Sequence, residues 1–136
     1  MPESSRRTDS SSPLLLLVED ERALRKVMEM VLEGEGYDVL TATDGREGLK
    51  LLAKNSPDLI ITDYMMPEMD GAEMVRRIKG NPRTARIPIL LMSAALPHDL
   101  PERRLVDCFL EKTGELADLL STIRRLLAGP AGDAAD

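Results

Sequence analysis

The chain has 136 residues, of which 43% are hydrophobic, so it can form one substantial core but not two ordinary domains. Its 18 Lys and Arg residues against 24 Asp and Glu residues give a formal charge of -6, which offers no obvious basic surface for nucleic acid. One cysteine excludes an internal disulfide, and no apolar run approaches the roughly 20 residues that span a bilayer. We therefore expect a cytoplasmic location, without direct nucleic-acid or membrane binding.

Both ends of the chain lack the apolar content of a core. Residues 1–12 are polar and aperiodic, and residues 129–136 are small and acidic, with Gly and Pro among them. We predict flexible tails over 1–12 and 129–136 and a single folded domain over 13–128.

Between these tails, short apolar runs alternate with segments of helical periodicity. After the first run, apolar residues recur at i, i+3, i+4 and i+7, as on one face of a helix. Gly34 and Gly36 end this predicted helix, and Asp44 can cap the helix after the second run. Similar helical segments follow the third and fifth runs. The predicted strands are residues 14–18, 37–42, 59–63, 87–92 and 106–110.

The segment after the fourth predicted strand contains Pro97 and Pro101. Proline is tolerated in the first turn of a helix but not in its interior. We therefore expect the fourth helix to be short, over about residues 100–106, or irregular.

Alternating strands and helices require a parallel sheet, because parallel strands are joined by crossovers that place helices over both faces. The predicted fold class is α/β: a doubly wound (βα)5, flavodoxin-like, three-layer sandwich with a five-stranded parallel sheet. In open sheets of this kind, ligands bind outside the carboxyl ends of the strands. That edge is therefore the place to look for a functional site.

Charged and polar side chains lie at or directly after the ends of four of the five predicted strands. Glu19 and Asp20 follow the first, Asp63 ends the third, Ser93 follows the fourth and Lys112 follows the fifth. Clustered carboxylates resist joint ionisation unless a cation compensates their charge. A few hard oxygen ligands favour Mg2+, which also binds phosphate oxygens. The sequence therefore predicts a Mg2+ site at this edge.

Four segments carry a resemblance to a known family: LLLLVEDE (14–21), IITDYMMPEMDG (60–71), ILLMSA (89–94) and FLEK (109–112). Together, in this order, they resemble the receiver domains of response regulators, the CheY-like superfamily of two-component signalling. The resemblance covers about residues 13–128 and implies a signalling module that is not an enzyme.

The resemblance implies that Asp63 is a phosphoacceptor that receives a phosphoryl group as an acyl phosphate. The donor would be a partner sensor histidine kinase or a phosphotransfer protein. Glu19, Asp20, Asp63 and the backbone carbonyl of Met65 would hold the Mg2+ ion. Phosphoryl transfer mainly requires positioning of the reacting groups and neutralisation of the charge on the phosphoryl oxygens, which a metal ion and a lysine supply.

The resemblance further implies that Lys112 contacts the phosphoryl group and that Ser93 is the switch hydroxyl that turns toward it. Phe109 matches the aromatic residue that follows this movement, although a strand at this position would bury an aromatic residue in any case. The expected output is a changed binding surface for an unknown downstream protein, in a monomer or a phosphorylation-dependent homodimer.

Some features leave alternatives open. Thr113 stands where the family has proline after the lysine, so we expect a trans peptide after Lys112. This departure and the unusual fourth-helix segment allow a phosphorylation-independent pseudo-receiver that acts as a scaffold. A Mg2+-dependent phosphohydrolase that forms an aspartyl phosphate would need a second, acid/base carboxylate two residues after the nucleophile, where this chain has Met65. A nucleotide-binding domain would need a Gly-rich loop after the first strand, which is absent from the sequence.

Overall fold

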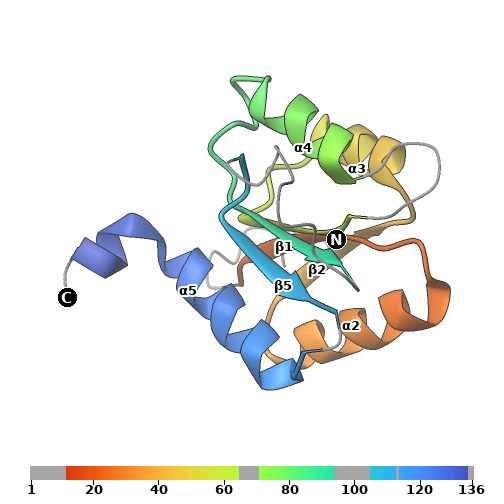
Figure 1. The fold of residues 1–136 in the computed structure, drawn as a ribbon, viewed down its shortest axis with the longest axis vertical. Coiled ribbons are helices and arrows are strands. Elements are labelled where there is room, and N and C mark those ends of the chain that lie inside the picture. Colours follow the sequence, from red (N-terminus) through yellow and green to blue (C-terminus); the bar gives the residue numbers. More distant parts are fainter. Residues whose placement is uncertain (1–11, 65–70, 94–104, 113, 135–136) are drawn as a thin grey trace, which may run out of the picture.

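A computed structural model of the chain describes residues 12–64, 71–93, 105–112 and 114–134. Strands and helices alternate along most of this length (Figure 1). The elements are β1 (Leu14–Val18), α2 (Arg22–Gly34), β2 (Asp38–Ala42), α3 (Gly45–Leu52), β3 (Leu59–Asp63), α4 (Gly71–Lys79), β4 (Ile89–Ser93), β5 (Cys108–Glu111) and α5 (Leu116–Ala134).

The five strands form one parallel sheet in the order β2-β1-β3-β4-β5. Every residue of β1, β3 and β4 is buried, as expected for central strands that are covered on both faces. The helices α3 and α4 cover one face, and α2 and α5 cover the other (Figure 1). The predicted fold class, a doubly wound three-layer sandwich, is confirmed.

Two hydrophobic clusters, one on each face of the sheet, hold the layers together. Because successive strand residues point to opposite faces, Leu16 and Ile60 pack toward α3 and α4, whereas Leu15 and Ile61 pack toward α2 and α5. A leucine-rich strand can therefore serve both clusters at once, which explains the uninterrupted apolar runs of the sequence.

The helix that follows β2 begins as predicted. The carboxylate of Asp44 accepts a hydrogen bond from the backbone N–H of Glu47 at 2.8 Å, and Glu47 in turn accepts one from the N–H of Thr43 at 2.6 Å. This reciprocal arrangement satisfies two backbone donors at the start of α3. The turn after α2 uses Gly36, whose positive φ of 97° suits glycine.

Helix α5 contains a break near its carboxy-terminal end. Gly129, with φ 73° and ψ 178°, interrupts the helix at the predicted end of the folded domain. Helical backbone then resumes and continues to Ala134, within the range predicted as a tail. A proline directly after the break is compatible with this, because proline fits the first turn of a new helical segment.

Other differences are small or fall outside the described residues. The strands β2, β4 and β5 begin one or two residues later than predicted, a common uncertainty at element ends. Most of the predicted fourth helix (100–106), Thr113 and the predicted tail over 1–11 lie outside the described residues. Among the described helices, none is both long and apolar enough to cross a membrane.

Gly71 lies at a close approach between the start of α4 and the end of β3. A Cβ atom added to Gly71 would lie 2.5 Å from the carbonyl oxygen of Asp63 and 2.9 Å from the Cα of Tyr64. These are backbone atoms, and the N–H of Gly71 donates to the carbonyl of Tyr64 at 2.8 Å. The start of α4 can therefore come this close to β3 only with glycine at this position.

We predict that Gly71→Ala lowers the free energy of unfolding by about 1–3 kcal/mol, as overpacking does. The control is Gly34→Ala in α2, where an added Cβ meets nothing within 4 Å. It should be neutral or stabilise by about 0.5–1 kcal/mol, because alanine favours helix more than glycine does. Urea denaturation measures both changes, and equal stability of the two variants would contradict the close approach at Gly71.

Candidate functional site

The site begins with Glu19, the residue directly after β1. Its N–H donates to the carbonyl of Ala42 at 3.0 Å, and its own carbonyl accepts from Nη1 of Arg25 at 2.9 Å. Oε2 of Glu19 accepts from the N–H of Glu21 at 3.1 Å. The side chain is fully buried. Backbone and side chain of Glu19 are thus fixed from several directions.

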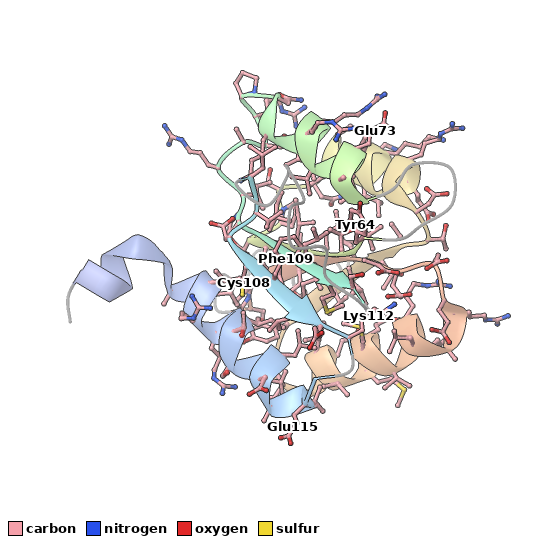
Figure 2. The ribbon with its side chains drawn as sticks, in the orientation of Figure 1. Tyr64, Glu73, Cys108, Phe109, Lys112 and Glu115 are labelled. Atoms are coloured by element: carbon pink, nitrogen blue, oxygen red, sulfur yellow. The ribbon has the colours of Figure 1, made fainter. Side chains whose placement is uncertain are left out.

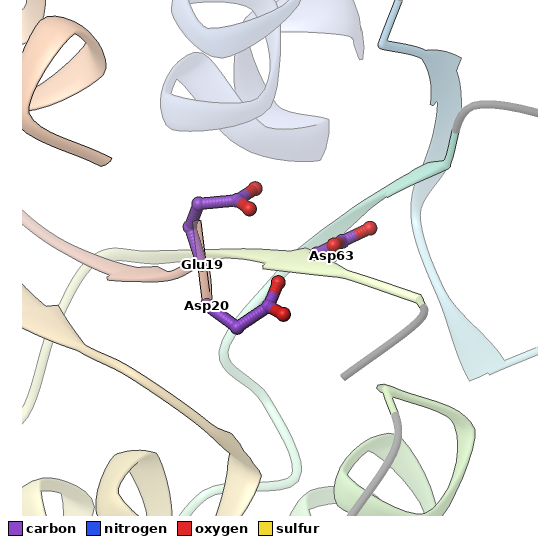
Figure 3. A group of neighbouring side chains, drawn as sticks. All are labelled: Glu19, Asp20 and Asp63. Carbon is purple, nitrogen blue, oxygen red and sulfur yellow. The ribbon is translucent and has the colours of Figure 1, made fainter. Parts of the chain in front are cut away.

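Asp63, the last residue of β3, brings a second buried carboxylate to the same edge. It is only 4% exposed, whereas Asp20, which follows Glu19, is exposed. One carboxylate oxygen from each of Glu19, Asp20 and Asp63 lies within 4.8 Å of the others (Figure 3). This is a spacing at which one small cation can contact all three side chains.

Lys112 supplies the positive charge of this cluster. Its Nζ lies 3.2 Å from Oδ2 of Asp63 and 3.1 Å and 3.3 Å from the two carboxylate oxygens of Glu19. The N–H of Lys112 donates to the carbonyl of Ser93 at 2.9 Å, which extends the parallel pairing of β4 and β5 by one residue. Lys112 lies directly after the end of β5 (Figure 2).

The charges in this cluster act on one another. Burial raises the pKa of the Glu19 carboxyl above its usual range, and the neighbouring charge of Asp63 adds to this. The N–H of Glu21 and the ammonium of Lys112 oppose the rise. Burial by itself lowers the pKa of Lys112, but its contacts with Glu19 and Asp63 outweigh burial and raise it. Lys112 is therefore charged at neutral pH.

The residues present fit a divalent metal ion. The cluster offers three carboxylates and no sulfur or nitrogen ligand, a donor set that suits Mg2+. Three negative charges against the single ammonium of Lys112 leave an excess that a divalent cation would balance. The backbone carbonyl of Met65, which the sequence also suggested as a ligand, lies outside the described residues.

Ser93 and Phe109 occupy neighbouring strands. Ser93 is the last residue of β4 and is 2% exposed. Phe109 is half-buried and pairs with Leu91 across the β4–β5 ladder (Figure 2). Cys108 and Leu110 on either side of Phe109 pack toward α2 and α5, so Phe109 points to the opposite face of the sheet.

The structure thus brings Glu19, Asp20, Asp63 and Lys112 together and places Ser93 at the adjacent strand end. Sequence reasoning missed Arg25, whose guanidinium holds the carbonyl of Glu19. The available signal was weak: Arg25 is a polar residue in the first turn of the predicted helix, close in sequence to the acidic pair.

A comparison of the sequence with protein-family models places this geometry in context. Residues 15–124 match the model described as the response regulator receiver domain. The chain belongs to the response-regulator receiver family. The resemblance of its four motifs to this family is therefore confirmed, and the receiver match contains every candidate site residue.

Two relatives show how this receiver domain compares with longer proteins. It is 48% identical over 82 residues to the transcriptional regulatory protein AfsQ1 of Streptomyces coelicolor, covering 60% of this chain and 35% of that protein. It is 33% identical over 118 residues to the DNA-binding dual master transcriptional regulator RpaA of Synechocystis, covering 85% of this chain and 49% of that protein. The chain thus spans half or less of these relatives.

Solved structures of receiver domains are also similar. The signal receiver domain of a histidine kinase from Syntrophus aciditrophicus is 34% identical, with a TM-score of 0.80 over 88% of this chain and 92% of that one. The receiver domain of the sensor histidine kinase PA1611 from Pseudomonas aeruginosa is 25% identical, with a TM-score of 0.78 over 87% and 99%. That structure holds a magnesium ion in its active-site cleft.

We predict that Lys112→Met in the metal-free receiver lowers the free energy of unfolding at pH 7.5 by about 1–3 kcal/mol. Loss of the Lys112 ammonium leaves the buried carboxylates of Glu19 and Asp63 without their cation. Because burial already raises the pKa of Glu19, the deficit is largest above that pKa. It should shrink as the pH falls and Glu19 takes up a proton.

Chemical denaturation in EDTA at pH 7.5 and 5.5 measures this effect. The matched control is Lys26→Met, since Lys26 is exposed on α2, and its effect should stay within about 0.5 kcal/mol. A Lys112→Met deficit that equals the control, or that grows on acidification, would refute the charge-balancing role of Lys112.

Proposed function

We propose that this chain is a phosphoacceptor receiver domain in which Asp63 accepts a phosphoryl group in a Mg2+-dependent reaction. The observation that carries the proposal is the position of the Asp63 carboxylate, which lies beside Glu19 and Asp20 and 3.2 Å from the ammonium of Lys112. The proposed role is that of a signalling module, with residues 13–128 as its folded domain.

In this proposal, an oxygen of the Asp63 carboxylate attacks the phosphorus of a phosphohistidine. The bond to the imidazole nitrogen breaks and an acyl phosphate forms. Glu19, Asp20, Asp63 and the carbonyl of Met65 would hold the Mg2+ ion. When bound, Mg2+ supplies charge neutralisation and orientation of the phosphoryl oxygens.

Lys112 would neutralise charge on the transferred group. Its Nζ pairs with both Glu19 and Asp63, so it can turn toward a phosphoryl oxygen while the contact with Glu19 keeps it in place. Ser93, buried at the end of β4, is the proposed switch hydroxyl, and Phe109 the proposed aromatic that responds to it. The phosphoryl group would then bias two states of a protein-binding surface.

The proposed donor is a sensor histidine kinase or a phosphotransfer protein, and an apolar groove beside the site supports its docking. The groove lies between α2 and α5, has a volume of about 410 Å3 and is lined by Leu24, Val27, Leu116 and Leu119, with Lys112 also in its lining. Val27 and Leu116 are 55% and 50% exposed, although both are apolar. A partner bound there would be close to Asp63.

We also propose that this segment itself does not bind nucleic acid and that it acts in the cytoplasm. Its net charge of -6 opposes association with a polyanion. RpaA is named as a DNA-binding protein, but the segment that this chain matches covers only 49% of its length. The scaffold alternative gains no support here, because Glu19, Asp20, Asp63 and Lys112 are assembled into one cluster.

We predict that incubation with acetyl phosphate and Mg2+ adds one phosphoryl group to the wild-type chain and none to Asp63→Asn. EDTA should prevent the addition to the wild type. The matched control is Asp118→Asn in the first turn of α5, which should be labelled like the wild type because this aspartate is exposed. Intact mass spectrometry reads out each sample, and labelling of a folded Asp63→Asn protein would exclude Asp63 as the acceptor.

We predict that Val27→Glu slows phosphoryl transfer from a phosphorylated histidine phosphotransfer protein by about tenfold or more, because a charge in the groove opposes apolar docking. Acetyl phosphate needs no docking, so labelling by it should be unchanged. Met30→Glu is the control, since Met30 lies on the same helix and is 69% exposed but does not line the groove. Equal slowing by both variants would argue against docking in this groove.

A further inference from the structure

The face formed by α3 and α4 is basic, although the chain as a whole is acidic. The two helices pack side by side on one face of the sheet (Figure 1). The described residues of this region outside the site include five acidic ones: Asp44, Glu47, Asp58, Glu73 and Asp107. The exposed basic residues on these helices and in the turns after them, here called the basic face, are Arg46, Lys50, Lys54, Arg76, Arg77, Arg83 and Arg86.

The five acidic residues are already engaged in contacts within the fold. Asp44 accepts a hydrogen bond from the N–H of Glu47 at 2.8 Å, and Asp107 accepts one from the N–H of Ile89 at 2.9 Å. Glu47 accepts hydrogen bonds from Thr43, and Asp58 accepts one from the N–H of Leu14 at 2.8 Å. Glu73 pairs with Arg77 at 2.9 Å on the surface of α4, where both side chains are largely solvated. A surface ion pair of this kind contributes little to stability, so Arg77 can exchange Glu73 for another carboxylate. Seven exposed basic residues against five acidic ones leave this region with an excess of positive charge.

A groove of about 230 Å3 lies within the basic face, between α3 and the turn that follows α4. Leu49, Leu52 and Ala53 form its apolar part. Arg77, Asn81 and Arg83 form its polar part. Two guanidinium groups beside an apolar surface can bind a segment that offers both carboxylates and an apolar side chain.

The turn that carries Arg83 is held by several hydrogen bonds. The N–H of Arg83 donates to Oδ1 of Asn81 at 2.9 Å, and Oγ1 of Thr84 donates to the carbonyl of Ile78 at 2.7 Å. Nζ of Lys79 donates to the carbonyls of Ala85 and Ile87 at 2.8 and 3.0 Å. A groove built on such a turn needs little further ordering to bind a partner, which favours affinity.

We propose that this groove binds an acidic segment of a partner protein, with its carboxylates on Arg77 and Arg83 and an apolar side chain against Leu49 and Ala53. The net charge of -6 acts against a long polyanion such as nucleic acid, whereas a short acidic segment senses mainly the local charge. The groove lies toward the end of α4 opposite Gly71, so the proposal does not depend on phosphorylation of Asp63.

The test uses the 15N-labelled full chain and a twelve-residue peptide of alternating Glu and Leu. The peptide should shift the backbone amide resonances of α3, α4 and the turn around Arg83, and a peptide with Gln in place of Glu should not. The double variant Arg77→Ala/Arg83→Ala should weaken binding by about tenfold or more, the effect of losing charge-assisted hydrogen bonds.

The control variant Arg22→Ala/Arg124→Ala removes two exposed arginines from α2 and α5, away from the groove, and should bind the peptide like the wild type. Thermal unfolding establishes that each variant is folded. Absence of shifts around the groove, or equal weakening by the control variant, would overturn the proposal. Tighter binding of oligodeoxythymidine or of phosphatidylserine vesicles to the same residues would overturn the assignment of the partner as an acidic protein segment.

Discussion

The contact of one ammonium group with two buried carboxylates is the constraint on which the rest of the site depends. Nζ of Lys112 lies within 3.3 Å of oxygen atoms of both Glu19 and Asp63, which come from distant parts of the sequence. Buried carboxylates at this spacing are costly without a cation. The parallel sheet solves the problem geometrically, because its register places the ends of β1, β3 and β5 at one edge.

Two features of the sequence allowed the fold and most of the site to be predicted. The uninterrupted apolar runs of β1, β3 and β4 indicated strands buried on both faces, and the charged residues at the ends of the strands indicated the edge that holds the candidate site. Other features depend on tertiary packing, which periodicity does not report. Gly71 is required by the approach of α4 to the backbone of Asp63, and Arg25 acts through a carbonyl that only the folded loop presents. The basic face could not be predicted from the net charge of -6, because that value sums the charges of the whole chain.

The helix α4 runs from the carboxylate cluster to the groove of the basic face. It begins with Gly71, packed against the backbone at Asp63, and ends with Lys79, which holds the turn that carries Arg83. The apolar groove between α2 and α5 lies on the other face of the sheet, with Lys112 in its lining. A phosphodonor and an acidic partner could therefore bind to separate surfaces of one small domain, as is common for signalling modules that must receive and transmit information.

In the function proposed for this chain, the carboxylates of Glu19, Asp20 and Asp63 form a Mg2+-dependent phosphoacceptor site balanced by Lys112. A crystal structure with Mg2+ and beryllofluoride, a mimic of the phosphoryl group, tests it most directly. We predict that Mg2+ binds among these carboxylates, with beryllofluoride on Asp63 and Nζ of Lys112 against a fluorine atom. A structure with beryllofluoride on another residue, or with Mg2+ away from the cluster, would contradict it.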